Sequence, residues 1–560
     1  MGKKIKRLSL LVLLLVITQT AFCGKPKPDA VYHLIRKEYK INEDGSTDMR
    51  FRKEMQLFSH DAFFHTYGET LILYNADFQT LTINEAYTVR KDGSKVETPA
   101  NAFNPSLPAG CTDCERFNTI REMVVTHTAL EYDATIVLDY TIHTEANFLG
   151  IWMERVDLCE PAPIERYEVS VTLPAEYNLQ YMVNCYGRQV QPAKDTQNLQ
   201  YRMSWVFEDL PQRPAEAYLP HDYLPFMMMT TIGDPTAFMS ELTFQNAFVP
   251  VEKNFYREAA AITVHAASDI DKILALRNYV ADMIHINDVS LKQMNYIIAS
   301  PSTVWQTNCG SRVDKDMLLA TLLRASGFQA EFGLLYGSLM DDAESAVKVT
   351  VQGGTYYISS AVKSPRSLSV LKAGDTFLSI QGTIQNFPKP VNSVDLIADF
   401  DIVMKDGAPK MDVNVRRSDI HSPQRSSMRP VSRTPSIRLK NMGSGYYEMT
   451  LPENYGCDLQ PSRIAPDRTL PVEVVTGEEN YSFTITLPAG ARCLTKPYKI
   501  EQSSEFGSVM VELVCDGRTL TVNRKLSLKE PFVSGKKNLR RLRDMLVVWE
   551  TNKRIVFKNN

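Results

Sequence analysis

The stretch CGSRVDKDMLLATLLRASGFQAEFGLL, from Cys309 to Leu335, decides the fold. Ser311 and Asp314 have the spacing of a capping box, so we expect a helix to begin directly after Ser311. Gly327 predicts its end, because glycine readily takes the left-handed backbone that closes a helix. A cysteine just before such a helix raises the question of a catalytic thiol.

The residues around this stretch extend the pattern in both directions. SDIDKILALRNYVADMI (residues 268–284) predicts an earlier helix, with Ser268 and Asp271 in capping-box spacing and apolar residues on one face. Two predicted strands follow the central stretch, ESAVKVTVQ (344–352) and TYYISSAV (355–362). The order helix, helix, strand, strand predicts an α+β core, which we place at residues 245–365.

The chain on either side of this core is rich in predicted strands. EYKINEDGSTDMRFRKEMQLF (38–58) reads as a β-hairpin that turns at Asp44-Gly45, and LTINEAYTVRKDGSKVETP repeats the pattern at Asp92-Gly93. We therefore expect an N-terminal antiparallel β-sandwich over residues 24–235, in which the proline-rich segment 210–230 is a surface linker. Residues 380–560 predict a C-terminal β-rich domain with one short basic helix near its end.

Composition and the N-terminus indicate where the protein resides. The 560 residues are 44% hydrophobic and 23% charged with a net charge of −3, which does not favour a nucleic-acid partner. Residues 1–23 predict a signal peptide, because a basic start precedes the apolar run Leu8–Ile17. We expect an exported protein, periplasmic or at the cell surface, without a transmembrane segment in the mature chain. Bulky Phe22 before Cys23 disfavours a lipid anchor.

The cysteines of an exported chain can form disulfides. Cys111 and Cys114 form a C-x-x-C, for which we expect either a small loop disulfide or two free thiols. No second such pair completes a metal site, so we predict no metal and no cofactor. Cys159 can pair with Cys185, and Cys493 with Cys515, but the connectivity stays open.

The segment LLATLLRASGFQAEFGLL (318–335) resembles the helix-to-strand segment of the transglutaminase-like superfamily, which shares the papain-type cysteine arrangement. The flanking regions resemble β-rich domains of unknown function found beside such cores in exported proteins of Gram-negative bacteria. The resemblance implies a cysteine at the helix start, a histidine opening the next strand pair and an aspartate closing it. The helix N-terminus lowers the pKa of the thiol, the imidazole completes the ion pair, and the carboxylate orients the ring.

This sequence departs from the family pattern at each position. Counting back from Gly327 places Gly310 at the family's glycine, Asp314 at its aspartate and Arg312 at the nucleophile. Cys309 lies three residues before Arg312. The histidine position offers Glu344, Ser345 or Ala346, and the position of the closing aspartate offers Ser359, Ser360 or Ala361. The sequence has no histidine between His285 and His421.

These departures favour a pseudoenzyme, with Arg312, Ser345 and Ser360 at the degenerate triad positions. We expect a non-catalytic binding or scaffold module that holds an extended peptide or a glycan, with Trp305, Arg312, Asp314 and Tyr356 as candidate cleft residues. Trp305 and Tyr356 are equally compatible with a place in the core. The alternative is an active cysteine amide hydrolase or acyl transferase that uses Cys309 as its nucleophile. A third possibility is that the β domains bind partners through their loops.

Overall fold

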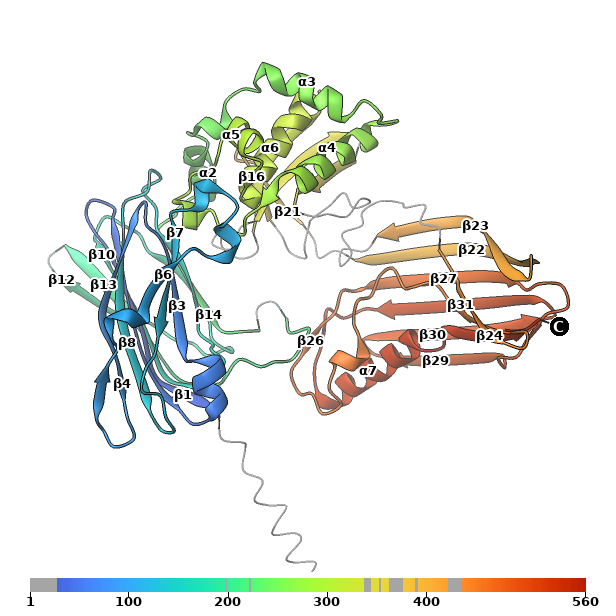
Figure 1. Cartoon of the computed structure of the whole chain (residues 1–560), viewed down its shortest axis with the longest axis horizontal. Coiled ribbons are helices and arrows are strands. Elements are labelled where there is room, and N and C mark those ends of the chain that lie inside the picture. The colour runs from blue at the N-terminus through green and yellow to red at the C-terminus, as the bar shows by residue number, and fades with distance from the viewer. Residues whose placement is uncertain are drawn as a thin grey trace, which may run out of the picture. The chain divides into compact units, whose positions relative to one another are not determined.

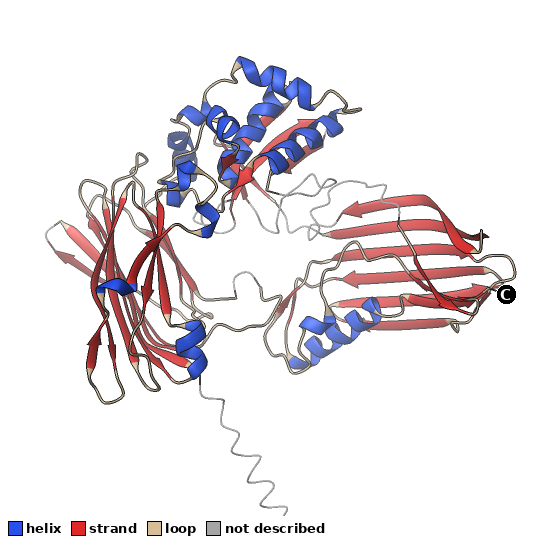
Figure 2. Cartoon of the chain, in the orientation of Figure 1, coloured by secondary structure: helices blue, strands red, loops and turns tan. Residues whose placement is uncertain are grey.

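The computed structural model describes residues 28–559 except 198, 221–222, 337–343, 352–353, 362–375, 388–390 and 422–434. The expected signal peptide and Cys23 lie outside the described residues. The chain forms two compact units. The first contains most of the chain up to residue 231, and the second contains residues 232–560 with the short segments Asp113–Glu115 and Ala215–Tyr223. The protein is a multidomain α+β chain in which β-rich regions precede and follow a helical region along the sequence (Figures 1 and 2).

The first unit is built from three sheets. An eight-stranded sheet has the order β12-β13-β10-β1-β2-β8-β4-β5, and two three-stranded sheets have the orders β3-β7-β6 and β11-β14-β9. The strands are β1 (Ala30–Ile41), β2 (Thr47–Leu57), β3 (Glu69–Asn75), β4 (Gln79–Val89), β5 (Lys95–Glu97), β6 (Phe103–Ser106), β7 (Ile120–Thr126), β8 (Thr135–Thr144), β9 (Met153–Asp157), β10 (Ile164–Pro174), β11 (Gln180–Asn184), β12 (Ala193–Gln197), β13 (Gln200–Leu210) and β14 (Phe226–Thr230).

Both predicted hairpins of the first unit are confirmed, and two other expectations need correction. Gly45 and Gly93 have φ values of 82° and 84° in the turns between β1 and β2 and between β4 and β5. The large sheet is not wholly antiparallel, because β1 pairs with β10 in parallel. The segment 210–230 is not all linker either. Its end forms β14, whose five residues are buried because the strand pairs with β11 on one side and β9 on the other.

The helical centre surrounds helix α6 (Arg312–Ala325). This helix contacts α3, α4, α5, β17 and β18, and residues 313–323 are all buried. A five-stranded sheet of order β19-β18-β17-β20-β21 and a parallel two-residue pair β15-β16 complete the region. Its other elements are α2 (Pro235–Leu242), α3 (Lys253–Ile262), α4 (Asp269–Met283), β15 (His285–Ile286), α5 (Pro301–Thr307), β16 (Cys309–Gly310), β17 (Gln329–Tyr336), β18 (Glu344–Val351), β19 (Gly354–Ile358), β20 (Thr376–Ser379) and β21 (Ile384–Asn386).

The predicted ends of both central helices are confirmed. Ser268 and Ser311 are the N-caps of α4 and α6, and each side chain accepts a hydrogen bond from the backbone N–H three residues later. Gly327 has a φ of 85° directly after the α6 C-cap. Trp305, a candidate cleft residue, lies in α5.

In the C-terminal region, helix α7 packs against a six-stranded sheet. The sheet has the order β23-β22-β27-β31-β30-β29, beside a four-stranded sheet β24-β25-β33-β28 and the pair β26-β32. The elements are β22 (Asn392–Lys405), β23 (Ala408–His421), β24 (Arg438–Gly443), β25 (Tyr446–Thr450), β26 (Val472–Glu473), β27 (Gly477–Thr486), β28 (Arg492–Cys493), β29 (Tyr498–Ser504), β30 (Gly507–Asp516), β31 (Thr519–Leu528), β32 (Phe532–Val533), α7 (Lys536–Glu550) and β33 (Arg554–Lys558).

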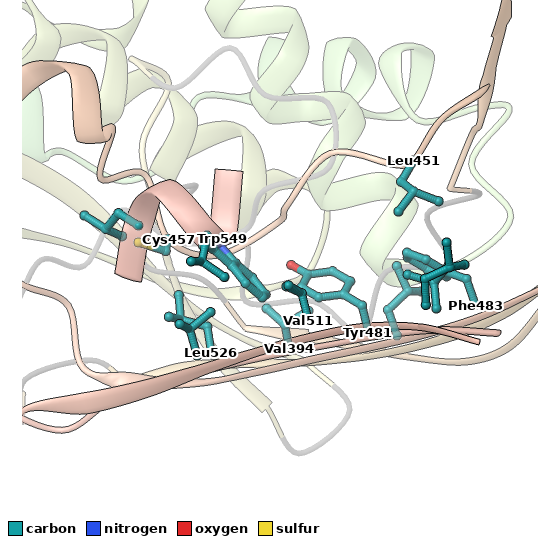
Figure 3. Packing of buried hydrophobic residues seen from close by; sticks show 14 of the residues in the cluster. Val394, Leu451, Cys457, Tyr481, Phe483, Val511, Leu526 and Trp549 are labelled. Carbon is teal, nitrogen blue, oxygen red and sulfur yellow. The ribbon is translucent and has the colours of Figure 1, made fainter. Parts of the chain in front are cut away.

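The predicted basic helix, α7, packs its apolar face against this sheet. Leu542, Leu546 and Trp549 are fully buried, and the Trp549 ring lies 5.7 Å from that of Tyr481 on β27. Figure 3 shows these two rings between the helix and the sheet, with Val394, Val511 and Leu526 on the sheet side. The basic residues of α7 therefore belong to a helix that is half buried by its own domain.

One disulfide is present among the described residues, and it joins Cys114 to Cys309 across 195 positions of sequence. Both expectations for Cys111 and Cys114, a small loop disulfide or two free thiols, are therefore wrong, because Cys114 has a distant partner and Cys111 alone is free. Cys111, Cys159, Cys185, Cys493 and Cys515 are thiols, so the two further pairings considered are not formed. No helix in the described part of the chain is long and apolar enough to cross a membrane.

Candidate functional site

The predicted nucleophile region lies at the start of α6. Asp314 belongs there to the capping box that closes the N-terminus of the helix. Asp314 Oδ2 accepts hydrogen bonds from Ser311 N at 2.9 Å and Ser311 Oγ at 2.8 Å, and its Oδ1 accepts one from Ala299 N at 2.7 Å. The side chain is 1% exposed. Gly310 lies close to this side chain, because a Cβ at this position would be 3.0 Å from Asp314 Cβ, which is tighter than an ordinary contact. Asp314 therefore holds the helix start together and does not line an open cleft.

Cys309, the candidate nucleophile, precedes this cap on β16. Its sulfur is bonded to Cys114, which belongs to the short segment Asp113–Glu115 of the same unit. Both cysteines are buried. In this state Cys309 has no thiol to ionise, and nucleophilic chemistry at this sulfur requires the disulfide to open first.

Arg312 occupies the first turn of α6, at the position of the family's cysteine. Its Nη1 lies 3.1 Å from Glu344 Oε2 on β18, and both side chains are 38% exposed. A cation at a helix N-terminus opposes the helix dipole, so the partner carboxylate offsets an unfavourable position. Glu344 is one of the three residues at the histidine position. An ion pair thus joins the predicted nucleophile position to one of the three residues considered for the histidine position.

The remaining triad positions converge on Asp316, a residue that the sequence analysis did not single out. Asp316 Oδ2 accepts hydrogen bonds from Ser345 Oγ at 2.7 Å and Ser359 Oγ at 2.8 Å. Its Oδ1 accepts bonds from Ser360 N and Ser360 Oγ, both at 2.7 Å. Asp316 is fully buried, and this desolvation raises the pKa of its carboxyl, while the hydrogen bonds act in the opposite direction. Ser345 and Ser360 therefore belong to a solvent-excluded polar network.

Lys315 is the second buried charge of α6 that sequence reasoning missed. Its side chain is 1% exposed, and its Nζ donates to Ile284 O at 2.6 Å and to Ala281 O at 3.4 Å. These carbonyls close the C-terminus of α4, where a cation is electrostatically favourable. The signal for both residues was present in the sequence, since the run Asp314-Lys315-Asp316 places three consecutive charges in a helix with apolar residues on every side.

His285 is the titratable side chain whose backbone lies directly beside Cys309. The two residues are register partners in the parallel pair β15-β16, and His285 N donates to Asn308 O at 2.7 Å. The imidazole is 52% exposed, and its Nε2 lies 3.8 Å from Asp113 Oδ2. The structure therefore brings a histidine and a carboxylate to the disulfide from outside the family's usual positions.

Trp305, predicted to line a cleft, borders an open groove on helices α3, α4 and α5. The groove has a volume of about 540 Å³. The Trp305 ring stacks on Tyr279 with centroids 5.4 Å apart, and Phe255 meets it edge-on at 5.9 Å. The groove residues include the carboxylates Glu258 and Asp282 and no basic side chain. Tyr356, the other predicted aromatic, is half buried on the edge strand β19 and does not line this groove.

No group of three or more metal-ligating side chains that could hold an ion occurs among the residues that the structure describes. The two candidate sites of this region are the disulfide with its neighbours His285 and Asp113, and the groove beside Trp305.

Comparisons with known proteins identify the two flanking domains. Residues 43–214 match the model of a domain of unknown function with solved structures, DUF3857, and residues 446–557 match that of a second, DUF3858. No curated protein matches the chain.

Among solved structures, the chain resembles a protein provisionally described as a protease, from Parabacteroides distasonis. The TM-score is 0.76 at 24% identity, over 95% of this chain and 99% of that one, so the two share a fold. A protein provisionally described as a cysteine protease, from Cytophaga hutchinsonii, aligns at 9% identity with a TM-score of 0.21, over 48% of this chain and 94% of that one. A TM-score this low carries no argument about fold or activity.

Proposed function

We propose that the protein is an exported, non-catalytic binding module whose helical centre is a degenerate transglutaminase-like core. The observation that carries the proposal is the set of bonds at the triad positions. Arg312 is paired with Glu344, and Ser345 and Ser360 are bonded to the buried carboxylate of Asp316. These positions are filled by a self-sufficient structural network, so a nucleophile, a base and an orienting acid do not meet there.

The groove beside Trp305 is the proposed ligand site. Stacked aromatic rings offer apolar contact to a peptide side chain or to the face of a sugar, and Asn278 adds an amide at the wall. Glu258 and Asp282 favour a neutral or cationic ligand and disfavour an anionic one. The ligand of this groove is, in this proposal, an extended peptide or glycan without net negative charge.

Binding to peptide and glycan arrays, followed by calorimetric titration of the ligands found, tests this assignment. Trp305→Ala and Asp282→Asn are expected to weaken binding about tenfold or more. Asp288→Asn, which removes an exposed carboxylate that does not line the groove, serves as the matched control and leaves affinity unchanged. Equal affinity of all three variants would disprove the groove assignment.

The alternative function, a cysteine amide hydrolase or acyl transferase, is supported by one observation. His285 lies beside Cys309 in register, so reduction of the disulfide would leave a thiol near an imidazole. The reduced protein is to be labelled with a thiol-reactive probe at graded pH. Rapid labelling of Cys309 well below pH 7, abolished in His285→Gln, supports this alternative. Labelling no faster than that of an unfolded control supports the binding module.

A further inference from the structure

The C-x-x-C of the sequence is split by the fold. Cys114 is bonded to Cys309, while Cys111, three positions earlier, is a buried thiol. Cys111 ends the turn Ala109–Cys111, and Cys114 directly precedes the turn Glu115–Phe117. Two cysteines at C-x-x-C spacing can close a disulfide with each other. Cys114 therefore has two possible partners, one along the chain and one in the helical centre.

We propose that Cys111, Cys114 and Cys309 form a thiol–disulfide exchange site that controls whether Cys309 is free. The Cys111 thiolate attacks the sulfur of Cys114, a Cys111–Cys114 bond forms, and the Cys114–Cys309 bond breaks. The electron pair leaves on the sulfur of Cys309. Cys111 loses one proton and Cys309 gains one, so the exchange needs no oxidant or reductant.

His285 is placed to serve the leaving sulfur. Hydrogen bonds from His285 N to Asn308 O and from Asn287 N to Gly310 O, at 2.7 and 3.0 Å, fix β15 alongside β16. Register partners in adjacent strands carry their side chains on the same face, so the imidazole and the Cys309 side chain project to one face of the pair. Asp113, the sequence neighbour of Cys114, places its carboxylate 3.8 Å from the imidazole Nε2. We assign His285 the role of a general acid that passes a proton to the Cys309 thiolate.

Burial of the three cysteines keeps the Cys114–Cys309 disulfide in place until this part of the structure opens locally. Cys111 and Cys114 are each 4% exposed and Cys309 is 5% exposed, whereas His285 and Asp113 lie at the surface. Burial also raises the pKa of the Cys111 thiol, which keeps that sulfur protonated and a weak nucleophile. Exchange therefore requires a local opening, and it frees Cys309 and releases segment 113–115 from its covalent bond.

The experiment follows disulfide connectivity in the full chain. The protein is incubated without added thiol or oxidant, free thiols are trapped by alkylation, and the disulfide peptides are mapped by mass spectrometry without reduction. The expected result is a mixture of Cys114–Cys309 and Cys111–Cys114 peptides, with Cys309 alkylated in the second species. A single Cys114–Cys309 species at all times, with alkylation confined to other cysteines, would overturn the proposal.

Four variants sharpen this test. Cys111→Ser is expected to hold Cys309 fully in its disulfide. Cys309→Ser, folded in the presence of glutathione disulfide as oxidant, is expected to yield the Cys111–Cys114 bond. Two alkylated thiols at positions 111 and 114 of Cys309→Ser would also overturn the proposal. Cys185→Ser removes another buried thiol and leaves the exchange unaltered. His285→Gln slows the exchange several-fold with the same final mixture, whereas an unchanged rate removes His285 from the site. The wild-type mapping decides the matter even if a serine variant fails to fold, and none of these outcomes depends on the proposed ligand groove.

Discussion

Arg312 Nη1 and Glu344 Oε2 lie 3.1 Å apart, so an ion pair connects the start of α6 with the start of β18. Arg312 is the residue predicted at the nucleophile position, and Glu344 is one of the three residues considered for the histidine position. The ion pair engages both side chains in a structural contact.

This ion pair should contribute little to stability. Both side chains are 38% exposed, so we expect a coupling energy on the order of 0.5 kcal/mol. Glu344→Ala is expected to destabilise more than Arg312→Ala, because removing the arginine also removes a charge that opposes the helix dipole. A double-mutant cycle of urea unfolding, at low and high salt, measures the coupling. A salt-independent coupling above about 2 kcal/mol would show that solvent screening is much weaker than this exposure implies.

Asp316, in contrast, should be among the costliest polar residues to truncate. Asp316→Ala leaves the hydroxyls of Ser345, Ser359 and Ser360 without their shared acceptor, and we expect a loss of about 3–5 kcal/mol. Asp316→Asn should cost clearly less, because its amide oxygen can accept from Ser360 N and the serine hydroxyls can rotate to accept from its NH₂. Ser345→Ala should cost about 1 kcal/mol. Chemical denaturation of the three variants checks this order, and equal losses for Asp316→Ala and Asp316→Asn would contradict it.

Restoring a family residue should fail for the same reason. Ser360→Asp would place a second carboxylate against the buried Asp316, and like charges at hydrogen-bonding distance cannot both ionise in a buried site. One carboxyl pKa is then raised in the folded protein, so the variant is most destabilised at neutral pH and recovers as pH falls below the raised pKa. Ser360→Ala is the control without the added charge. Unfolding curves from pH 4 to pH 8 test this, and a pH-independent cost would contradict the repulsion.

Local signals in the sequence predicted much of this fold. The features that it did not predict depend on pairing between segments far apart in the chain. The caps at Ser268 and Ser311 and the turns at Gly45 and Gly93 are each set within a few residues, and they appear as expected. The parallel pairing of β1 with β10 joins strands more than a hundred residues apart, and no local pattern specifies it.

The same limit applies to the candidate site. The partner of Cys114 lies 195 residues away, and a neighbouring cysteine three residues away was the simpler expectation. The role of Asp316 depends on serines from two later strand ends, so it becomes visible only once β18 and β19 lie against α6. The absence of a histidine at the family position needed no structure, since it followed from counting residues.

Lys53, Thr70 and His127 form a buried polar cluster in the first unit. Lys53 Nζ donates to Thr70 Oγ1 at 2.6 Å, and Thr70 Oγ1 lies 2.7 Å from His127 Nε2. His127 is 5% exposed, and its Nδ1 has no hydrogen-bond partner among the described residues. Burial, and secondly the Lys53 charge, lowers the pKa of His127 to about 3.

The folded state therefore binds fewer protons at this site than the unfolded state. The resulting stability is complete above the unfolded pKa of about 6.5 and is lost as pH falls toward 3, at about 1.4 kcal/mol per pH unit. His127→Gln should flatten the pH dependence of unfolding in this window relative to the wild type. Lys53→Met should raise the His127 pKa measured by NMR, yet leave it below 6.5, because burial is the larger cause. A His127 pKa that does not change in Lys53→Met would show that the lysine charge is screened from the imidazole.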